Sequence, residues 1–141
     1  MGQLPFPVAA DISIAPPNYL PKVSRPRAGQ VIIGAAKTGM DSVFFWLNQG
    51  VDRDHITWIV SNDAWLLDRV SIDPDQLVDI LEKQLECCAA ANALEELYTS
   101  TKAEDMLLRL DPNIWPTKFL CTTVNQEELH QLRQIKNMVR L

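Results

Sequence analysis

The sequence lacks any long apolar run, and its hydrophobic stretches fall far short of the about 18 to 20 residues that a bilayer-spanning helix needs. No charged start followed by an apolar block marks a signal peptide. Basic residues are not in excess: 13 Lys plus Arg stand against 18 Asp plus Glu, and the net charge of −5 repels phosphate backbones at long range. We therefore expect a cytoplasmic protein that binds neither membranes nor nucleic acid.

Cysteine and histidine are also scarce. Cys87, Cys88 and Cys121 form neither a CxxC pair nor an even disulfide framework, so we expect reduced, mostly buried thiols. His55 and His130 have no Cys or His neighbour at a metal-ligand interval, so the sequence predicts no metal site. No arrangement of nucleophile, base and orienting group is recognisable, and no catalytic residue is assigned.

Prolines are concentrated at one end of the chain, where six of the nine fall within the first 26 residues. Each proline fixes its own backbone angle and disfavours helix in the residue before it. The pattern predicts an extended, irregular segment over residues 1–30. The remaining residues, 31–141, have a length suited to one domain.

A strand, a helix and a second strand are predicted directly after this segment. The residues Val31–Ile33 are β-branched and bounded by Gly34, which predicts a short strand buried on both faces. From Thr38, apolar residues recur at spacings of three and four until Gly50, as in an amphipathic helix. The β-branched and aromatic residues 56–60 predict the second strand. We expect an α/β fold with a partial Rossmann-like β–α–β unit, followed by a helical segment.

The helical segment is predicted as an insertion over residues 74–110. Asp73 and Pro74 are typical of a helix start, and an apolar stripe through Ala-rich sequence predicts one long helix over 74–98. A second helix is expected after the capping pair Thr101 and Glu104, through residue 110. The stripe of the long helix comprises Leu77, Ile80, Leu81, Leu85, Cys88, Leu94 and Leu97.

The last part of the chain predicts a mixture of strand and helix. Residues 119–121 are interpreted as a strand after a turn-rich connection. Asn125 and Glu128 have the spacing of a capping box ahead of an apolar helical stripe. Residues 139–141 resemble a strand that has only begun.

The loop between the first predicted strand and helix carries the strongest functional signal. It reads Gly34, Ala35, Ala36, Lys37, Thr38, Gly39, close to the dinucleotide-binding pattern GxGxxG. The first glycine permits a tight turn and the last permits close helix packing, whereas the middle glycine is replaced by alanine, whose methyl group obstructs a pyrophosphate. A plain strand-to-helix turn is the alternative, and the flanking strand, helix and strand favour a nucleotide site.

The end of the second predicted strand bears on which cofactor binds. A carboxylate there accepts hydrogen bonds from a ribose 2′-OH, whereas an arginine pairs with a 2′-phosphate. The residues are Ser61, Asn62 and Asp63, and no arginine occurs until Arg69, so no strong NADP preference is indicated. Asp63 at such a position is more typical of a turn.

Residues 31–69, with the blocks KTGMD, ITWIV and DAWLLDR, resemble the internal pyridine-nucleotide-binding region of FAD/NAD(P)-binding oxidoreductases related to flavin-containing monooxygenases. The family's loop usually reads GAGKT. The resemblance continues in residues 18–21, 108–112 and 128–135. It implies that loop 34–39 faces the pyrophosphate of NAD(P), that Ser61 and Asn62 lie beside its ribose, and that hydride passes to a flavin held elsewhere.

Such flavoproteins carry an FAD motif in an amino-terminal domain, and nothing before Gln30 provides a strand, a GxGxxG and a helix. We therefore expect a truncated fragment that holds the NAD(P)-binding portion and is inactive alone. Its partners would be a nicotinamide dinucleotide and either the missing flavin domain or a second copy of the chain. A non-catalytic interaction module and a remnant without function are the alternatives.

Overall fold

The computed structural model describes residues 7–23 and 29–141, so part of the proline-rich segment, residues 1–6 and 24–28, lies outside the described residues. Within the described part, residues Pro17–Lys22 form a 3-10 helix, η1, which packs beside the helix α1. Pro17 stands at the first helical position, where its missing N–H costs little.

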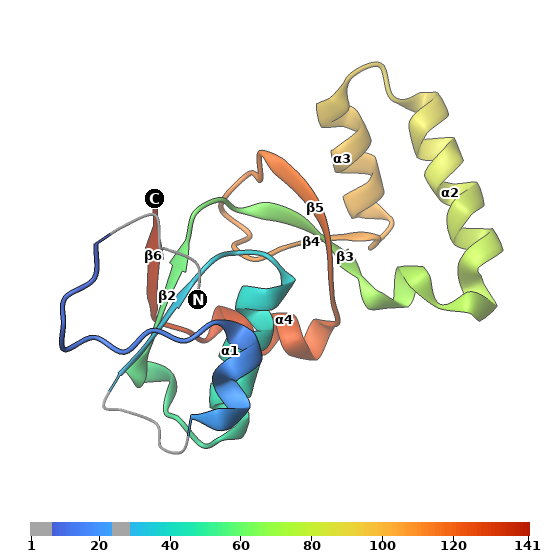
Figure 1. The fold of residues 1–141 in the computed structure, drawn as a ribbon. Coiled ribbons are helices and arrows are strands. Elements are labelled where there is room, and N and C mark those ends of the chain that lie inside the picture. The colour runs from blue at the N-terminus through green and yellow to red at the C-terminus, as the bar shows by residue number, and fades with distance from the viewer. Residues whose placement is uncertain (1–6, 24–28) are drawn as a thin grey trace.

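The predicted strand, helix and strand are all present, as β1 (Gln30–Ile33), α1 (Lys37–Asn48) and β2 (Ile56–Val60). β1 and β2 are parallel, so the three elements form a β–α–β unit of the α/β class. The predicted terminal strand is also confirmed: β6 (Asn137–Arg140) pairs in parallel with the other edge of β2. The resulting sheet has the order β1-β2-β6 (Figure 1).

One face of this first sheet is covered and the other is open. Ile32 and Trp58 belong to the hydrophobic core together with buried residues of α1 and of α4 (Gln126–Arg133). Val31 and Ile33 point to the opposite face and are 64% and 60% exposed. The prediction that this strand is buried on both faces is therefore wrong. A run of β-branched residues is typical of a strand buried on both faces. Burial of the second face also needs another element packed on it, which the strand's own sequence does not reveal.

A second sheet follows after only three residues. β3 (Ala64–Asp68) lies between β4 (Leu107–Arg109), with which it is antiparallel, and β5 (Lys118–Val124), with which it is parallel. The strand predicted over residues 119–121 is confirmed as part of β5. The pairing shifts within β5 because Phe119 lies opposite Trp65 whereas Thr122 lies opposite Leu66. Cys121, at this bulge, adopts a φ of 49°.

The predicted long helix is two helices, α2 (Leu77–Ala90) and α3 (Leu94–Ala103), which form a hairpin that projects from the two sheets (Figure 1). The chain becomes extended at Ala91, and the Glu96 carboxylate accepts the N–H of Asn92 at 2.9 Å. This side-chain partner satisfies a backbone group at the start of α3 and favours a break despite the high helix propensity of alanine.

The helix predicted after Thr101 is also wrong. Thr101 lies inside α3, where its hydroxyl donates to the carbonyl oxygen of Leu97 at 2.7 Å, and the residues after it form β4. By contrast, the capping box of Asn125 and Glu128 is confirmed at the start of α4. Asp73 caps η4 (Pro74–Gln76), which leads into α2; two further 3-10 turns are η2 (Arg53–His55) and η3 (Arg69–Ile72).

The apolar stripe of the predicted long helix does not face a core, because most of its leucines are exposed.

Of the three cysteines, Cys87 is buried whereas Cys88 and Cys121 are exposed, so the expectation of mostly buried thiols is wrong. In the part of the chain that the structure describes, no helix has the length and apolar character needed to cross a membrane. The exposed stripe residues are Leu77, Leu81, Leu85, Cys88 and Leu94.

Candidate functional site

The residues predicted to bind a nucleotide come together at one edge of the first sheet. Loop 34–39 follows β1 and leads into α1, and Ser61 and Asn62 follow β2. Because β1 and β2 are parallel neighbours, their carboxyl ends meet at the same edge. In open α/β sheets, ligands bind in the crevice outside the carboxyl ends of the strands.

Two glycines set the shape of the loop. Gly34 has a φ of +122°, a conformation that side chains rarely allow. Gly39 is packed so closely on Gly34 that a Cβ at residue 39 would lie 2.1 Å from the carbonyl oxygen of Gly34. The buried indole of Trp58 donates to that same carbonyl oxygen at 2.7 Å. The start of α1 is therefore held against the end of β1 in the manner that the spacing of the two glycines predicts.

The middle position of the motif lies at the start of α1. Ala36 is the N-cap residue, has extended backbone angles, and is exposed. Its carbonyl oxygen accepts the N–H groups of Gly39 and Met40, but no side chain caps the helix. Because the first N–H groups of a helix have no intrahelical partners, this end presents donors and a positive dipole beside the Ala36 methyl group.

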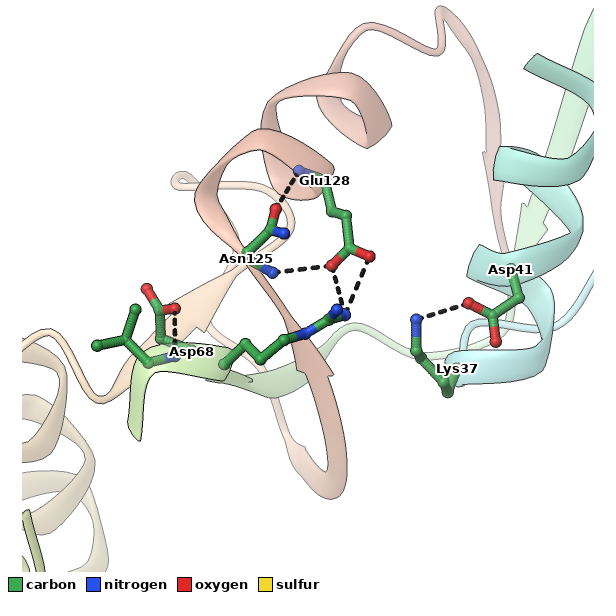
Figure 2. A network of polar contacts seen from close by, with 7 residues as sticks. Lys37, Asp41, Asp68, Asn125 and Glu128 are labelled. Atoms are coloured by element: carbon green, nitrogen blue, oxygen red, sulfur yellow. Dashed lines mark hydrogen bonds and ion pairs between the residues drawn. The ribbon is translucent and has the colours of Figure 1, made fainter. Parts of the chain in front are cut away.

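The other loop residues differ in their surroundings. Ala35 is buried in the hydrophobic core, whereas Thr38 is exposed. Lys37 forms an ion pair with Asp41 one turn along α1, with Nζ 2.6 Å from Oδ1 (Figure 2). Both side chains are substantially exposed, so the pair contributes little to stability. An anion at the start of α1 would compete with Asp41 for this lysine.

The connection after β2 consists of residues 61–63. Ser61 is exposed and Asn62 is half-buried. Asp63 lies in this connection, as the sequence predicts, and its side chain is 10% exposed, with Oδ2 accepting the Nε–H of Arg140 at 2.9 Å. Arg140 also contacts Asp111, with Nη2 3.3 Å from Oδ2. This ion-pair network occupies the edge next to Ser61 and Asn62.

Arg140 also lies at this edge, although it does not follow the second strand in the sequence. β6 brings it there, opposite Val60. The signal for it in the sequence is a basic residue within the predicted strand 139–141. Two carboxylates surround this one guanidinium, so the network has a net negative charge.

A second polar network supports the site from the side of the second sheet. The buried Asp68 accepts hydrogen bonds from the N–H of Val70 and the side-chain amide of Gln126. Glu128 accepts the N–H of Asn125 and both bonds from Nη2 of Arg69 (Figure 2). Each carboxylate is engaged in fastening β3 and η3 to α4. No group of three His, Cys, Asp or Glu side chains among residues 7–23 and 29–141 is arranged to hold a metal ion.

The chain is similar to known proteins whose names state no activity. The chain is 36% identical over its whole length to uncharacterized proteins of Mycobacterium bovis and Mycobacterium tuberculosis. It spans about a quarter of the length of these curated relatives, because the match covers 27% of each. Neither a protein-family model nor a solved structure matches the chain.

Proposed function

We propose that the edge formed by residues 34–39, Ser61 and Asn62 binds a nicotinamide dinucleotide. The observation that carries the proposal is the contact between Gly34 and Gly39, where a Cβ would lie 2.1 Å from a carbonyl oxygen. A dinucleotide-binding loop uses its first and last glycines for the turn and for close helix packing. The Rossmann-like character of the β–α–β unit is part of this proposal.

The side chains and backbone groups at this edge suit the parts of the cofactor. The uncapped N–H groups at the start of α1 would donate to the pyrophosphate, as helix N-termini do for anions. Lys37 adds a cation at the first turn. Ser61 and Asn62 supply a hydroxyl and an amide beside the ribose. These residues bind and orient the cofactor, and none of them is assigned a step of chemistry.

We further propose that the chain is the NAD(P)-binding portion of a cytoplasmic, flavin-dependent oxidoreductase. In that reaction, the nicotinamide would pass a hydride to a flavin held by another domain. The proposal is supported by the resemblance of residues 31–69 to the corresponding region of that family. It implies that the chain alone binds the cofactor without turning it over.

The middle position of the loop provides a direct test. We expect Ala36→Gly to tighten NADH or NADPH binding about tenfold, because removing the methyl group lets the pyrophosphate approach the helix N-terminus. Dissociation constants would be measured by calorimetric titration of the wild type and the variant.

The matched control is Ala93→Gly. Ala93 is the exposed N-cap of α3, with extended backbone angles and no side-chain cap, as Ala36 is for α1. The control should leave binding unchanged. Absence of saturable binding by both the wild type and Ala36→Gly, with either nucleotide, would refute the proposed site.

A further inference from the structure

The helix α2 has an apolar face that no element of the described chain covers. We call this face the α2 stripe. Its apolar residues recur at spacings of three and four, the pattern of the side of an amphipathic helix that is normally buried. Val78 is 77% exposed and Leu85 is 69% exposed, so the structure leaves these side chains in water. The α2 stripe comprises Leu77, Val78, Leu81, Leu85, Cys88 and Ala89.

The partner helix α3 does not account for the α2 stripe. The inward side of α2 is formed by the buried Cys87 and the half-buried Ile80 and Gln84, which are separate from the stripe. Figure 1 shows α3 between the second sheet and α2, and Tyr98 of α3 stacks on Trp65 of β3. One side of α2 therefore faces the rest of the described chain, and the α2 stripe lies on a side that does not. Exposed contiguous apolar surface of this kind is typical of a protein interface.

Charge indicates what kind of partner fits the stripe. Glu82 and Glu86 line one shallow groove together with Val78, Leu81 and Leu85. Over residues 73–105 the sequence has nine Asp and Glu against two Lys, a net charge of −7, whereas the whole chain has −5. The segment 73–105, which contains the hairpin and the residues that flank it, thus carries the negative charge of the chain, and all other residues together have a net charge of +2.

This charge distribution argues against two other occupants. A second copy would bring together two segments 73–105 of net charge −7 each, and like charges at an interface oppose association. An anionic membrane surface would be repelled for the same reason. A helix with apolar residues on one side and Lys or Arg beside them would pack its apolar side on the α2 stripe and pair its cations with Glu82 and Glu86 next to the stripe.

We propose that the α2 stripe is a docking surface for a basic amphipathic helix of another protein. The apolar side chains of that helix would pack on Val78, Leu81 and Leu85, and its cations would pair with Glu82 and Glu86. This surface is separate from the loop after β1, so the proposal does not rest on nucleotide binding.

The proposal is tested with a defined probe. An 18-residue fluorescent peptide made only of leucine and lysine, with its leucines on one helical face, would be titrated with the whole chain and followed by fluorescence polarisation. A second peptide with glutamate in place of every lysine tests the role of charge. We expect saturable binding of the lysine peptide, weakened by added salt, and no binding of the glutamate peptide.

Two variants separate the apolar and the charged contributions. Val78→Gln with Leu85→Gln should weaken binding of the lysine peptide at least tenfold, and both sites are exposed, so the fold is retained. Glu82→Gln with Glu86→Gln should weaken binding at least threefold and reduce its salt dependence. Circular dichroism of each variant checks that the helices are intact.

The matched control removes the same charge elsewhere in the segment 73–105. Glu95→Gln with Asp105→Asn should leave peptide binding within twofold of the wild type, and Asn is well suited to the φ of 56° at residue 105. Equal loss in this control, or equal binding of the glutamate peptide, would overturn the proposal. A dimer in light scattering that Leu85→Gln dissociates would also overturn it, by assigning the face to a second copy.

Discussion

At the scale of single residues, the most restrictive position in the candidate site is Gly39. A side chain there meets the carbonyl oxygen and carbonyl carbon of Gly34 at 2.1 and 2.9 Å, and both atoms belong to backbone that Trp58 also holds. Because backbone cannot move aside as a flexible side chain can, the start of α1 would have to shift away from β1. The geometry that would receive a pyrophosphate depends on this contact.

We therefore predict that Gly39→Ala lowers the free energy of unfolding by about 1 to 3 kcal/mol, the usual cost of overpacking. Urea denaturation would measure the change. Gly29→Ala is the matched control, because a Cβ there lies 3.8 Å from the nearest atom, the carbonyl oxygen of His55. The control should change stability by less than about 0.5 kcal/mol. Equal stability of Gly39→Ala and the wild type would contradict the packing role of this glycine.

Single residues of the site differ in how far the sequence could predict them. The roles of Gly34 and Gly39 in the turn and the packing follow from their spacing around a strand and a helix. The partnership of Asp63 with Arg140 could not be predicted this way, because the two residues are 77 positions apart and meet only through the pairing of β2 with β6. The sequence alone does not reveal which strand lies beside β2.

At the scale of elements, α4 is fastened at its start by a capping box and an ion pair that share Glu128. Asn125 accepts the N–H of Glu128, and the Glu128 carboxylate accepts the N–H of Asn125 and the guanidinium of Arg69. The capping box satisfies backbone groups that the helix leaves free, and the arginine joins the helix to the segment after β3. α4 in turn contributes the buried Leu129 and Leu132 to the core beneath the site.

Asn125→Ala should accordingly lower the free energy of unfolding by about 1 kcal/mol, the usual cost of losing an N-cap side chain. Thermal unfolding followed by circular dichroism provides the measurement. Asn48→Ala, at the exposed end of α1, is a control that should change stability by less than about 0.5 kcal/mol. An unchanged stability of Asn125→Ala would mean that the cap contributes nothing to the folded state.

Elements with strong local signals could be predicted from the sequence, and the others could not. α1 has a clear helical period and α4 has a capping box, so the sequence predicts both. It does not predict β3, because β3 follows β2 after three residues without a glycine or proline to mark the turn. It predicts helix in place of β4, because three residues are too few to show an alternating pattern.

At the scale of the whole molecule, apolar surface remains open in two places. The outer face of the first sheet exposes Val31, Ile33 and Val139, and the hairpin exposes the α2 stripe. A parallel sheet is normally covered on both faces. The relatives that match this chain are about four times as long, since it covers 27% of each. Open apolar surfaces of this kind are typical of protein contacts, whereas the edge with loop 34–39 is where we propose that a nucleotide binds.

The most direct test of the nucleotide site is a thermal unfolding scan of the whole chain, alone and with millimolar NADH, NADPH or FAD. A ligand that binds only the folded state stabilises it, by about 2.7 kcal/mol at a hundredfold excess over Kd. For a chain of this size we predict a rise in Tm on the order of 5 to 10 °C with a nicotinamide dinucleotide and none with FAD. A Tm unmoved by both NADH and NADPH would contradict the nucleotide site at the end of β1.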